Sequence, residues 1–183
     1  MRWLALLGFL LILSCETESE EPTGVPMPLA VGNWWFYEAE GPDSLYHVTD
    51  TLADSVDFAG YNAYLMLHRT PDGTDTLYVY YDDQDYLVWA DPGNTDTLFN
   101  RMAKKNMMPG DTWYMEEGST VLMKVGDEDS LSLPAGVFDA LPVLMISSSG
   151  DTMAIHWFTT GTGRVQHQDF SGFYHRLSDY HLN

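Results

Sequence analysis

The histidines are the first side chains in this sequence that could perform chemistry, because imidazole binds metal ions and exchanges protons near neutral pH. There are six of them: His47, His68, His156, His167, His175 and His181. His167, His175 and His181 lie near the C-terminus, where two adjacent strands could bring two of them together. No pair has the short spacing of a zinc site. We therefore predict ordinary surface or half-buried histidines, with no metal ion and no other cofactor.

A serine-rich segment suggests a second chemistry, that of a nucleophilic enzyme. Ser147-Ser148-Ser149-Gly150-Asp151 places hydroxyls beside an acid, and His156 follows shortly after. A catalytic serine has to be held on a strained turn with its base in reach. Consecutive serines before a glycine are instead typical of a hairpin tip. Gly161-Thr162-Gly163 is too short for a phosphate-binding loop and also indicates a hairpin turn. We predict that the protein is not an enzyme.

Two acidic segments could bind calcium through their carboxylates. They are Asp72-Gly73-Thr74-Asp75 and Asp91-Pro92-Gly93-Asn94-Thr95-Asp96. Neither follows the ligand spacing of an EF-hand loop. Glycine and proline beside aspartate are explained by turns, so calcium remains an alternative for these two segments.

The only cysteine, Cys15, ends the first segment of the chain. Arg2 precedes an unbroken apolar run from Trp3 to Leu13, and Ser14 follows. A membrane-spanning helix needs ~20 apolar residues. A short apolar run that starts with a positive charge and ends at a small residue has the layout of a secretion signal. Without a second cysteine the chain cannot form an internal disulfide.

The end of this segment, Leu11-Ile12-Leu13-Ser14-Cys15, resembles the lipobox of bacterial lipoproteins. The resemblance implies that residues 1–14 are removed and that Cys15 becomes the first residue and carries the lipid. Lipoproteins of this kind bear a diacylglyceryl thioether and usually a further acyl group, and several acyl chains are needed because one holds a protein only marginally. The implied location is the cell envelope, most simply the periplasmic or surface face of the outer membrane. The alternatives are an ordinary signal peptide with a chance cysteine and an uncleaved helix.

Composition limits the partners of the mature protein. The chain has 8 basic and 27 acidic residues, with a net charge of −19. Loss of residues 1–14 removes Arg2 and makes the net charge −20. Such a body repels nucleic acid and anionic lipid surfaces, so we predict no nucleic-acid partner. Aromatic residues make up 14% of the sequence, and they must be buried, line a groove or face a partner.

The chain after Cys15 divides into a linker and one domain. Residues 15–28 contain four glutamates, three prolines and a glycine, a composition that predicts a flexible acidic linker. Residues 29–183 are enough for one domain with a real core.

Within the domain, short segments rich in β-branched and aromatic residues alternate with turn residues. We expect strands over residues 33–40, 44–52, 60–69, 75–81, 86–90, 112–117, 120–125, 130–133, 141–146, 152–159, 164–168 and 172–180. Residues 98–108 could form a short helix or a strand, and we favour a strand followed by a loop. Pro142 predicts a sheet edge or bulge near the start of its strand.

A recurrent Asp-Thr-apolar triplet predicts where turns give way to strands. It begins at Asp50, Asp75, Asp96, Asp111 and Asp151, and each of the last four follows a glycine within three residues. Aspartate and glycine favour turns, and threonine favours extended backbone.

About ten short strands with hardly any helical period predict an all-β fold, an antiparallel meander that forms a curled sheet or barrel. Several strands are apolar on both faces, among them residues 34–37, 77–81 and 143–146. A sheet with one solvent-exposed face would not have this pattern, so the sheet must close on itself as a barrel or curl around a segment or ligand that covers its second face.

The turn and aromatic motifs of the domain resemble those of a group of bacterial envelope lipoproteins. The motifs are Gly32-Asn33-Trp34-Trp35, Pro109-Gly110-Asp111-Thr112-Trp113, Leu133-Pro134-Ala135-Gly136-Val137-Phe138-Asp139-Ala140, Trp157-Phe158 and Gly161-Thr162-Gly163-Arg164-Val165. The group is similar in outline to the half-open β-barrels of the lipoprotein carriers LolA and LolB. The resemblance implies a curved sheet and supplies no agreed catalytic residues to carry over to this chain.

The leading functional hypothesis is therefore a membrane-anchored, non-enzymatic envelope protein. Its curved sheet would hold a lipid or another apolar ligand, or the protein would assist envelope assembly. The alternative is a surface module that binds protein or glycan through exposed Trp and Tyr, and it predicts a solvent-facing aromatic cluster instead of an enclosed pocket. Nothing in the sequence specifies an oligomeric state.

Overall fold

The computed structural model describes residues 24–42, 44–93 and 99–183, and this part of the chain consists of strands joined by turns and loops, without a helix. Its 13 strands form one antiparallel sheet, which confirms the predicted fold class. Within the same residues, no helix has the length and apolarity needed to cross a membrane.

Most strands follow the predicted segments. The strands are β1 (Trp34–Glu40), β2 (Leu45–Phe58), β3 (Tyr61–Thr70), β4 (Gly73–Tyr81), β5 (Tyr86–Ala90), β6 (Phe99–Lys104), β7 (Thr112–Tyr114), β8 (Leu122–Val125), β9 (Asp129–Leu133), β10 (Gly136–Ile146), β11 (Thr152–Thr159), β12 (Gly163–Asp169) and β13 (Tyr174–His181). In contrast to the prediction, β2 runs on to Phe58, β7 ends at Tyr114 and β10 already begins at Gly136. The uncertain segment 98–108 contains strand β6 followed by a loop, as favoured from the sequence.

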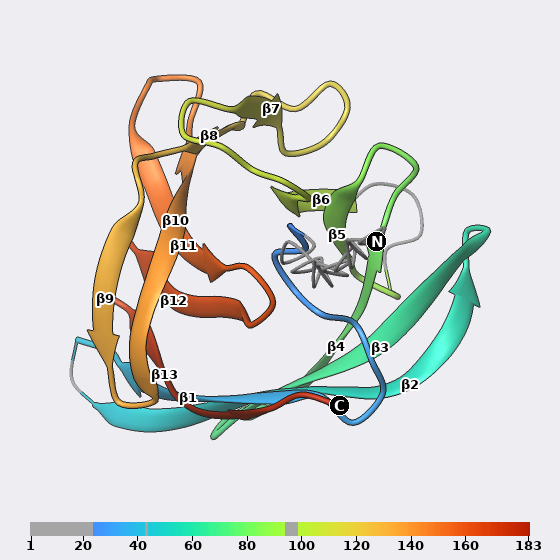
Figure 1. The fold of residues 1–183 in the computed structure, drawn as a ribbon, viewed down its shortest axis with the longest axis vertical. Coiled ribbons are helices and arrows are strands. Elements are labelled where there is room, and N and C mark those ends of the chain that lie inside the picture. Colours follow the sequence, from blue (N-terminus) through green and yellow to red (C-terminus); the bar gives the residue numbers. More distant parts are fainter. Residues whose placement is uncertain (1–23, 43, 94–98) are drawn as a thin grey trace, which may run out of the picture.

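The sheet curls around an enclosed interior (Figure 1). The strand order is β6-β5-β4-β3-β2-β1-β13-β12-β11-β10-β8-β7, and β9 pairs with β10. The two ends of this order meet, because the backbone N–H of Arg101 in β6 donates to the carbonyl oxygen of Met115, just after β7, at 2.7 Å. The indole N–H of Trp113 donates to the carbonyl oxygen of Arg101 at 2.8 Å. These two hydrogen bonds close the curl.

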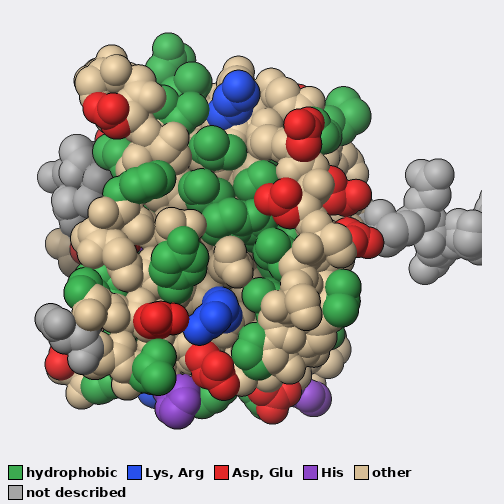
Figure 2. All heavy atoms as spheres, turned by 90° about the vertical axis from the view of Figure 1, so that its left-hand side faces the viewer, with side chains coloured by type: hydrophobic (Ala, Val, Ile, Leu, Met, Phe, Trp, Pro, Cys, Tyr) green, Lys and Arg blue, Asp and Glu red, His purple; other side chains and the backbone are tan. Residues whose placement is uncertain are grey.

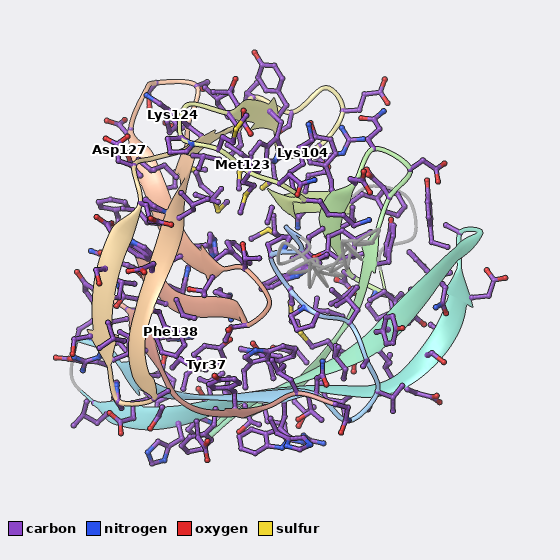
Figure 3. The ribbon with its side chains drawn as sticks, viewed as in Figure 1. Tyr37, Lys104, Met123, Lys124, Asp127 and Phe138 are labelled. Carbon is purple, nitrogen blue, oxygen red and sulfur yellow. The ribbon has the colours of Figure 1, made fainter. Side chains whose placement is uncertain are left out.

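Alternation along the strands fills the interior with large side chains. Trp35, Tyr37 and Ala39 of β1 are buried there, whereas Glu38 and Glu40 face solvent. Tyr37 and Met123, from opposite sides of the curl, both point into the enclosed space (Figure 3). The main core includes buried residues from nearly every strand, so hydrophobic burial drives the curling.

Pro142 lies where β10 changes partner on one side. Residues 136–140 of β10 pair with β9, and residues 143–146 pair with β8. The carbonyl oxygen of Pro142 accepts from Gly126 N–H at 2.8 Å, in the gap between these two partners. The missing N–H of proline therefore costs no ladder hydrogen bond, and β10 continues through a residue that the sequence suggested was an edge or bulge.

Two segments of the chain itself occupy the middle of the curl (Figure 1). Met27 is 2% exposed, and its backbone N–H and C=O bond the Tyr81 hydroxyl at 3.1 Å and 2.9 Å. The hairpin turn between β11 and β12 also points inward, where Gly161 N–H donates to the carbonyl oxygen of Val25 at 2.9 Å. The packed domain thus includes residues 24–28, which the sequence analysis places in the linker, because Met27 supplies an apolar side chain to the core.

Candidate functional site

A second hydrophobic cluster lies on the outer face of the sheet. It is built from Ala63, Tyr80, Val88 and Ala90, which alternate along β3, β4 and β5 with residues of the main core. The far end of the β2–β3 hairpin packs against it, since the Phe58 ring lies 4.4 Å from Tyr78 and 6.2 Å from Tyr80. This cluster explains why residues 77–81 are apolar on both faces.

A pocket of about 480 Å³, here called the outer-face pocket, opens beside this cluster. Its apolar lining includes three aromatic rings, those of Tyr61, Tyr80 and Phe99. Tyr61 stacks on Tyr80 with ring centroids 4.7 Å apart. Tyr61 is half-buried and Phe99 is 37% exposed, so both rings present area to solvent. The surface-module hypothesis predicts exposed Trp and Tyr, and here one Tyr ring and one Phe ring face solvent.

Charged groups form the rim of the outer-face pocket. They are Asp82 at the end of β4, Arg101 on β6, and Glu116 and Glu117 in the turn after β7. Arg101 Nε lies 3.2 Å from Asp82 Oδ2, and the guanidinium stacks on Tyr86 at 4.6 Å from the ring centroid. The Arg101–Met115 backbone bond holds the turn that bears the two glutamates against β6. The bond that closes the sheet therefore also completes the pocket.

Tyr80 remains protonated throughout the physiological pH range. Burial, together with the nearby Tyr61 and Asp82, raises its pKa to about 12. The aromatic lining of the pocket is thus uncharged, and the negative charge comes from the carboxylates at the rim.

Inside the curl, a buried ion pair connects strands on different sides of the interior. Arg164 Nη2 on β12 lies 3.1 Å from Asp50 Oδ2 on β2, and the two side chains are 7% and 2% exposed. Asp50 Oδ1 also lies 2.6 Å from His68 Nδ1. The Arg164 guanidinium lies over the rings of Trp89 and Tyr37, at 4.8 Å and 5.4 Å from their centroids. A buried charge requires such a partner, so this pair is structurally important.

Three of the six histidines form a row across the inner face of β11, β12 and β13. His156 pairs with His167 and His167 pairs with His175 in the strand registers. The Nδ1 atoms of His156 and His167 are 3.1 Å apart, and His156 Nε2 is 3.3 Å from Met145 Sδ.

The row of histidines is held neutral. The pKa of His167 is lowered to about 3 and that of His175 to about 4, mainly by burial and secondly by the positive charge of the nearby Arg164. Burial and the neighbouring His167 lower the pKa of His156 well below its usual range. Among the described residues, no group of three or more His, Cys, Asp or Glu side chains is arranged to hold a metal ion.

The structure separates the residues of the other candidate sites. Ser149 Oγ donates to Asp151 Oδ2 at 2.6 Å in an exposed turn, whereas His156 is buried and contacts Met145 and His167. The Gly161–Gly163 segment is a hairpin turn, as predicted, and Trp35 Nε1 donates to the carbonyl oxygen of Thr162 at 2.6 Å.

Of the two calcium candidates, residues 91–93 lie at a turn, whereas in the other only Asp72 is a turn residue and residues 73–75 begin strand β4. Asp72 N–H donates to the Thr70 hydroxyl at 3.3 Å, and Gly93 N–H donates to the Asp91 carboxylate at 2.8 Å. Asp96 and the predicted lipid-bearing Cys15 lie outside the described residues.

Sequence reasoning missed the residues of the outer-face pocket and the buried role of Asp50. The strand expected over residues 44–52 contains Asp50, and Asp50 does lie in β2, but it is 2% exposed there and does not mark a turn. The triplet pattern fails at Asp75 as well, which lies inside β4. The pocket residues come from β3, β4, β5, β6 and neighbouring turns, and no local pattern joins them.

A smaller cavity of about 390 Å³ lies near the N-terminal segment, between it and β10–β11. Met107, Met108, Leu141 and Phe158 supply its apolar lining, and Lys104, Glu128 and Asp139 bring charge to it. It is the nearest feature to the enclosed apolar pocket expected of a carrier.

No protein-family model matches the chain, and no curated protein matches it in sequence. Among solved structures, a Bacteroides fragilis protein described as exported and as having a YmcC-like fold is similar, with a TM-score of 0.52 and 11% identity. That match covers 85% of this chain and 98% of the other. A Parabacteroides distasonis protein described as a lipoprotein gives a TM-score of 0.48 at 15% identity, over 87% of this chain and 99% of the other. The first likeness shows a shared fold.

Proposed function

We propose that this chain is a lipid-anchored protein of the bacterial cell envelope whose β-domain is a non-catalytic binding module. Cys15 carries the lipid, and the outer-face pocket is the surface that contacts a partner. The observation that carries the proposal is the pair of solvent-facing rings, Tyr61 and Phe99, at a pocket on the outside of a sheet whose inside is filled.

The filled interior favours an outer binding surface over a carrier. Met27 and the β11–β12 turn occupy the middle of the curl, and core side chains such as Trp35 and Tyr37 are 0% and 1% exposed. A lipid-sized ligand would have to displace these groups. The 390 Å³ cavity beside the N-terminal segment brings three charged side chains to any apolar guest, and burying such groups against hydrocarbon is costly.

The envelope location is supported by the start of the chain and agrees with the fold. The apolar run that ends at Cys15 has the layout of a lipoprotein signal. A protein that shares this fold is described as exported. The high acidic charge keeps the body away from anionic lipid headgroups, so the lipid anchor would be its membrane attachment and the outer membrane its site.

Photocrosslinking in cells tests the binding surface. A benzoylphenylalanine at position 99 would lie in the outer-face pocket, and one at position 137 provides the control. Val137 is 73% exposed on β10. Figure 2 shows one face of the molecule, on which hydrophobic side chains gather among acidic ones. We expect defined crosslinked species from position 99 and few from position 137. Equal crosslinking from both positions, or none from position 99, would refute the assigned surface.

The anchor is tested separately with an alkyne fatty acid. Label should appear on the wild-type protein and be absent from Cys15→Ser, which should also leave the membrane fraction. Labelling that persists in Cys15→Ser would contradict the lipid attachment at this residue.

A further inference from the structure

The rim of the outer-face pocket carries uncompensated negative charge. Of the described residues that line it, Arg101 alone is a cation, and it is neutralised by Asp82 at 3.2 Å and stacked on Tyr86. Among the described residues, no ion pair includes Glu116 or Glu117. Lys105, which follows β6, pairs with Asp85 at 2.6 Å. Lys104 lines the 390 Å³ cavity beside the N-terminal segment. Two carboxylates are therefore left to attract a ligand.

The aromatic lining suits the same kind of ligand as the carboxylates. Tyr61 and Phe99 present partly exposed rings, and Tyr61 is held in place by stacking on Tyr80. The face of an aromatic ring carries negative electrostatic potential, so it attracts a guanidinium or ammonium group. Carboxylates beside such rings add charge-assisted hydrogen bonds. Rings and glutamates together form an environment that favours a cation with an apolar stem.

The charge of the whole protein excludes anionic polymers as partners at this site. The net charge of −19 would repel phosphorylated or carboxylated polysaccharides and steer positively charged segments toward the surface. A neutral glycan would use the rings, but it would gain nothing from the net charge of the rim.

We infer that the outer-face pocket binds an arginine- or lysine-bearing segment of a protein partner. The cationic side chain lies against the rings of Tyr61 and Phe99, and its charged end faces Glu116 and Glu117. This inference rests on the proposed function and adds the chemical class of the partner.

The test uses three defined probes with the detergent-solubilised full-length protein. The first is a fluorescein-labelled peptide, Gly-Arg-Gly-Arg-Gly-Arg, and the second replaces each arginine by citrulline, a neutral isostere. The third is cellohexaose, a neutral glycan. Fluorescence anisotropy reports peptide binding, and calorimetry reports glycan binding. We expect the arginine peptide to bind about tenfold more tightly than the citrulline peptide, because citrulline lacks the positive charge that the rings and carboxylates attract.

Charge-neutralising variants locate the binding. Glu116→Gln combined with Glu117→Gln should weaken the arginine peptide by about three- to tenfold, in line with two partly exposed ion pairs. Asp127→Asn combined with Glu128→Gln is the matched control, because it removes two adjacent exposed charges from another turn. The control pair should change the affinity by less than about twofold.

Three outcomes would overturn the inference. They are equal binding of the arginine and citrulline peptides, an equal effect of the two double variants, and binding of cellohexaose alone. The in-cell crosslink at position 99 distinguishes failure of the proposed function from failure of the present inference. If that crosslink forms and the peptides are not distinguished, the pocket binds a partner of another class and only the present inference fails.

Discussion

Arg101 and Met115 join the two ends of the sheet, through an N–H···O hydrogen bond of 2.7 Å between β6 and the residue that follows β7. Arg101 is also the residue whose side chain neutralises Asp82 and whose carbonyl oxygen accepts from Trp113. Closure of the curl and construction of the outer-face pocket therefore depend on the same residue. We call the contact between Arg101 and Met115 the seam. A substitution that weakens the seam should also weaken the attachment of the turn that bears Glu116 and Glu117 and completes the pocket.

Trp113→Phe tests this coupling. The substitution removes the 2.8 Å hydrogen bond to the Arg101 carbonyl oxygen, keeps most of the buried area and should lower the free energy of unfolding by about 1 kcal/mol. Hydrogen exchange at the Arg101 amide should accelerate. Trp34→Phe, at a position stacked on His181 outside the curl, is the control and should leave that amide unchanged. Unaltered exchange at Arg101 in Trp113→Phe would show that the seam does not need this bond.

The ion pair between Asp50 and Arg164 predicts a large effect of removing one partner. Asp50→Asn leaves the Arg164 guanidinium buried without a counter-charge, and such a loss costs about 3–5 kcal/mol. Combining it with Arg164→Met should cost less than the sum of the two single variants, because no unpaired charge remains. Urea unfolding measures all three variants.

Glu40→Gln is the matched control for that pair. Glu40 pairs with Arg176 at 3.1 Å, but both side chains are largely exposed, so its loss should cost less than about 1 kcal/mol. Similar costs for Asp50→Asn and Glu40→Gln would mean that the interior pair is not desolvated.

The neutral histidine row predicts a loss of stability in mild acid. The pKa values of His167 and His175 fall to about 3 and about 4 in the folded protein, whereas unfolded histidine titrates near 6.5. Between these values the unfolded chain binds protons that the folded chain does not, so stability is full above pH ~6.5 and falls as the pH drops toward 4. Each such histidine contributes up to about 1.4 kcal/mol per pH unit.

Urea unfolding at pH 7.5 and pH 5.0 checks this dependence. The wild type should be clearly weaker at pH 5.0, and His167→Gln should lose less stability between the two pH values. His47→Gln, at an exposed position on the outer face, is the control and should follow the wild type. A wild-type stability that is constant over this range would contradict the neutral row.

Gly163 predicts a steric effect inside the curl. Its φ is +115°, and a Cβ at this position would lie 2.9 Å from Trp35 Nε1. Gly163→Ala should therefore destabilise the protein by more than the ~1–2 kcal/mol expected from left-handed backbone alone. Gly161 has a φ of +77°, and a Cβ added there would have no atom within 4 Å. Gly161→Ala therefore measures the backbone cost alone. Equal thermal shifts for the two variants would exclude the contact with Trp35.

The strands were predictable because their pattern is local. Thr152–Thr159 was predicted with the bounds that the structure gives, since turn residues flank a run of strand formers. The strands that are apolar on both faces also indicated a curled sheet correctly. Two clusters cause this pattern on β4, where Val79 faces the main core and Tyr80 faces the outer cluster.

The outer-face pocket was not predictable from the sequence, because it depends on which strands meet. Tyr61 and Phe99 are far apart in the chain, and Glu116 reaches them only through the Arg101–Met115 seam. The buried ion pair of Asp50 was not predictable for a related reason. Its carboxylate is satisfied by Arg164, 114 residues away, and nothing near it in sequence reveals that partner.

Hydroxyl-radical footprinting of the protein in intact envelopes, compared with the purified protein, tests the central claim most directly. Phe99 and Tyr61 are the probes in the outer-face pocket, and Phe170, which is 60% exposed in the turn between β12 and β13, reports a surface outside it. We predict that Phe99 and Tyr61 are oxidised more slowly in envelopes, whereas Phe170 is oxidised at the same rate in both samples. Equal oxidation of Phe99 and Tyr61 in the two samples would show that no partner covers the pocket and would contradict the proposed function.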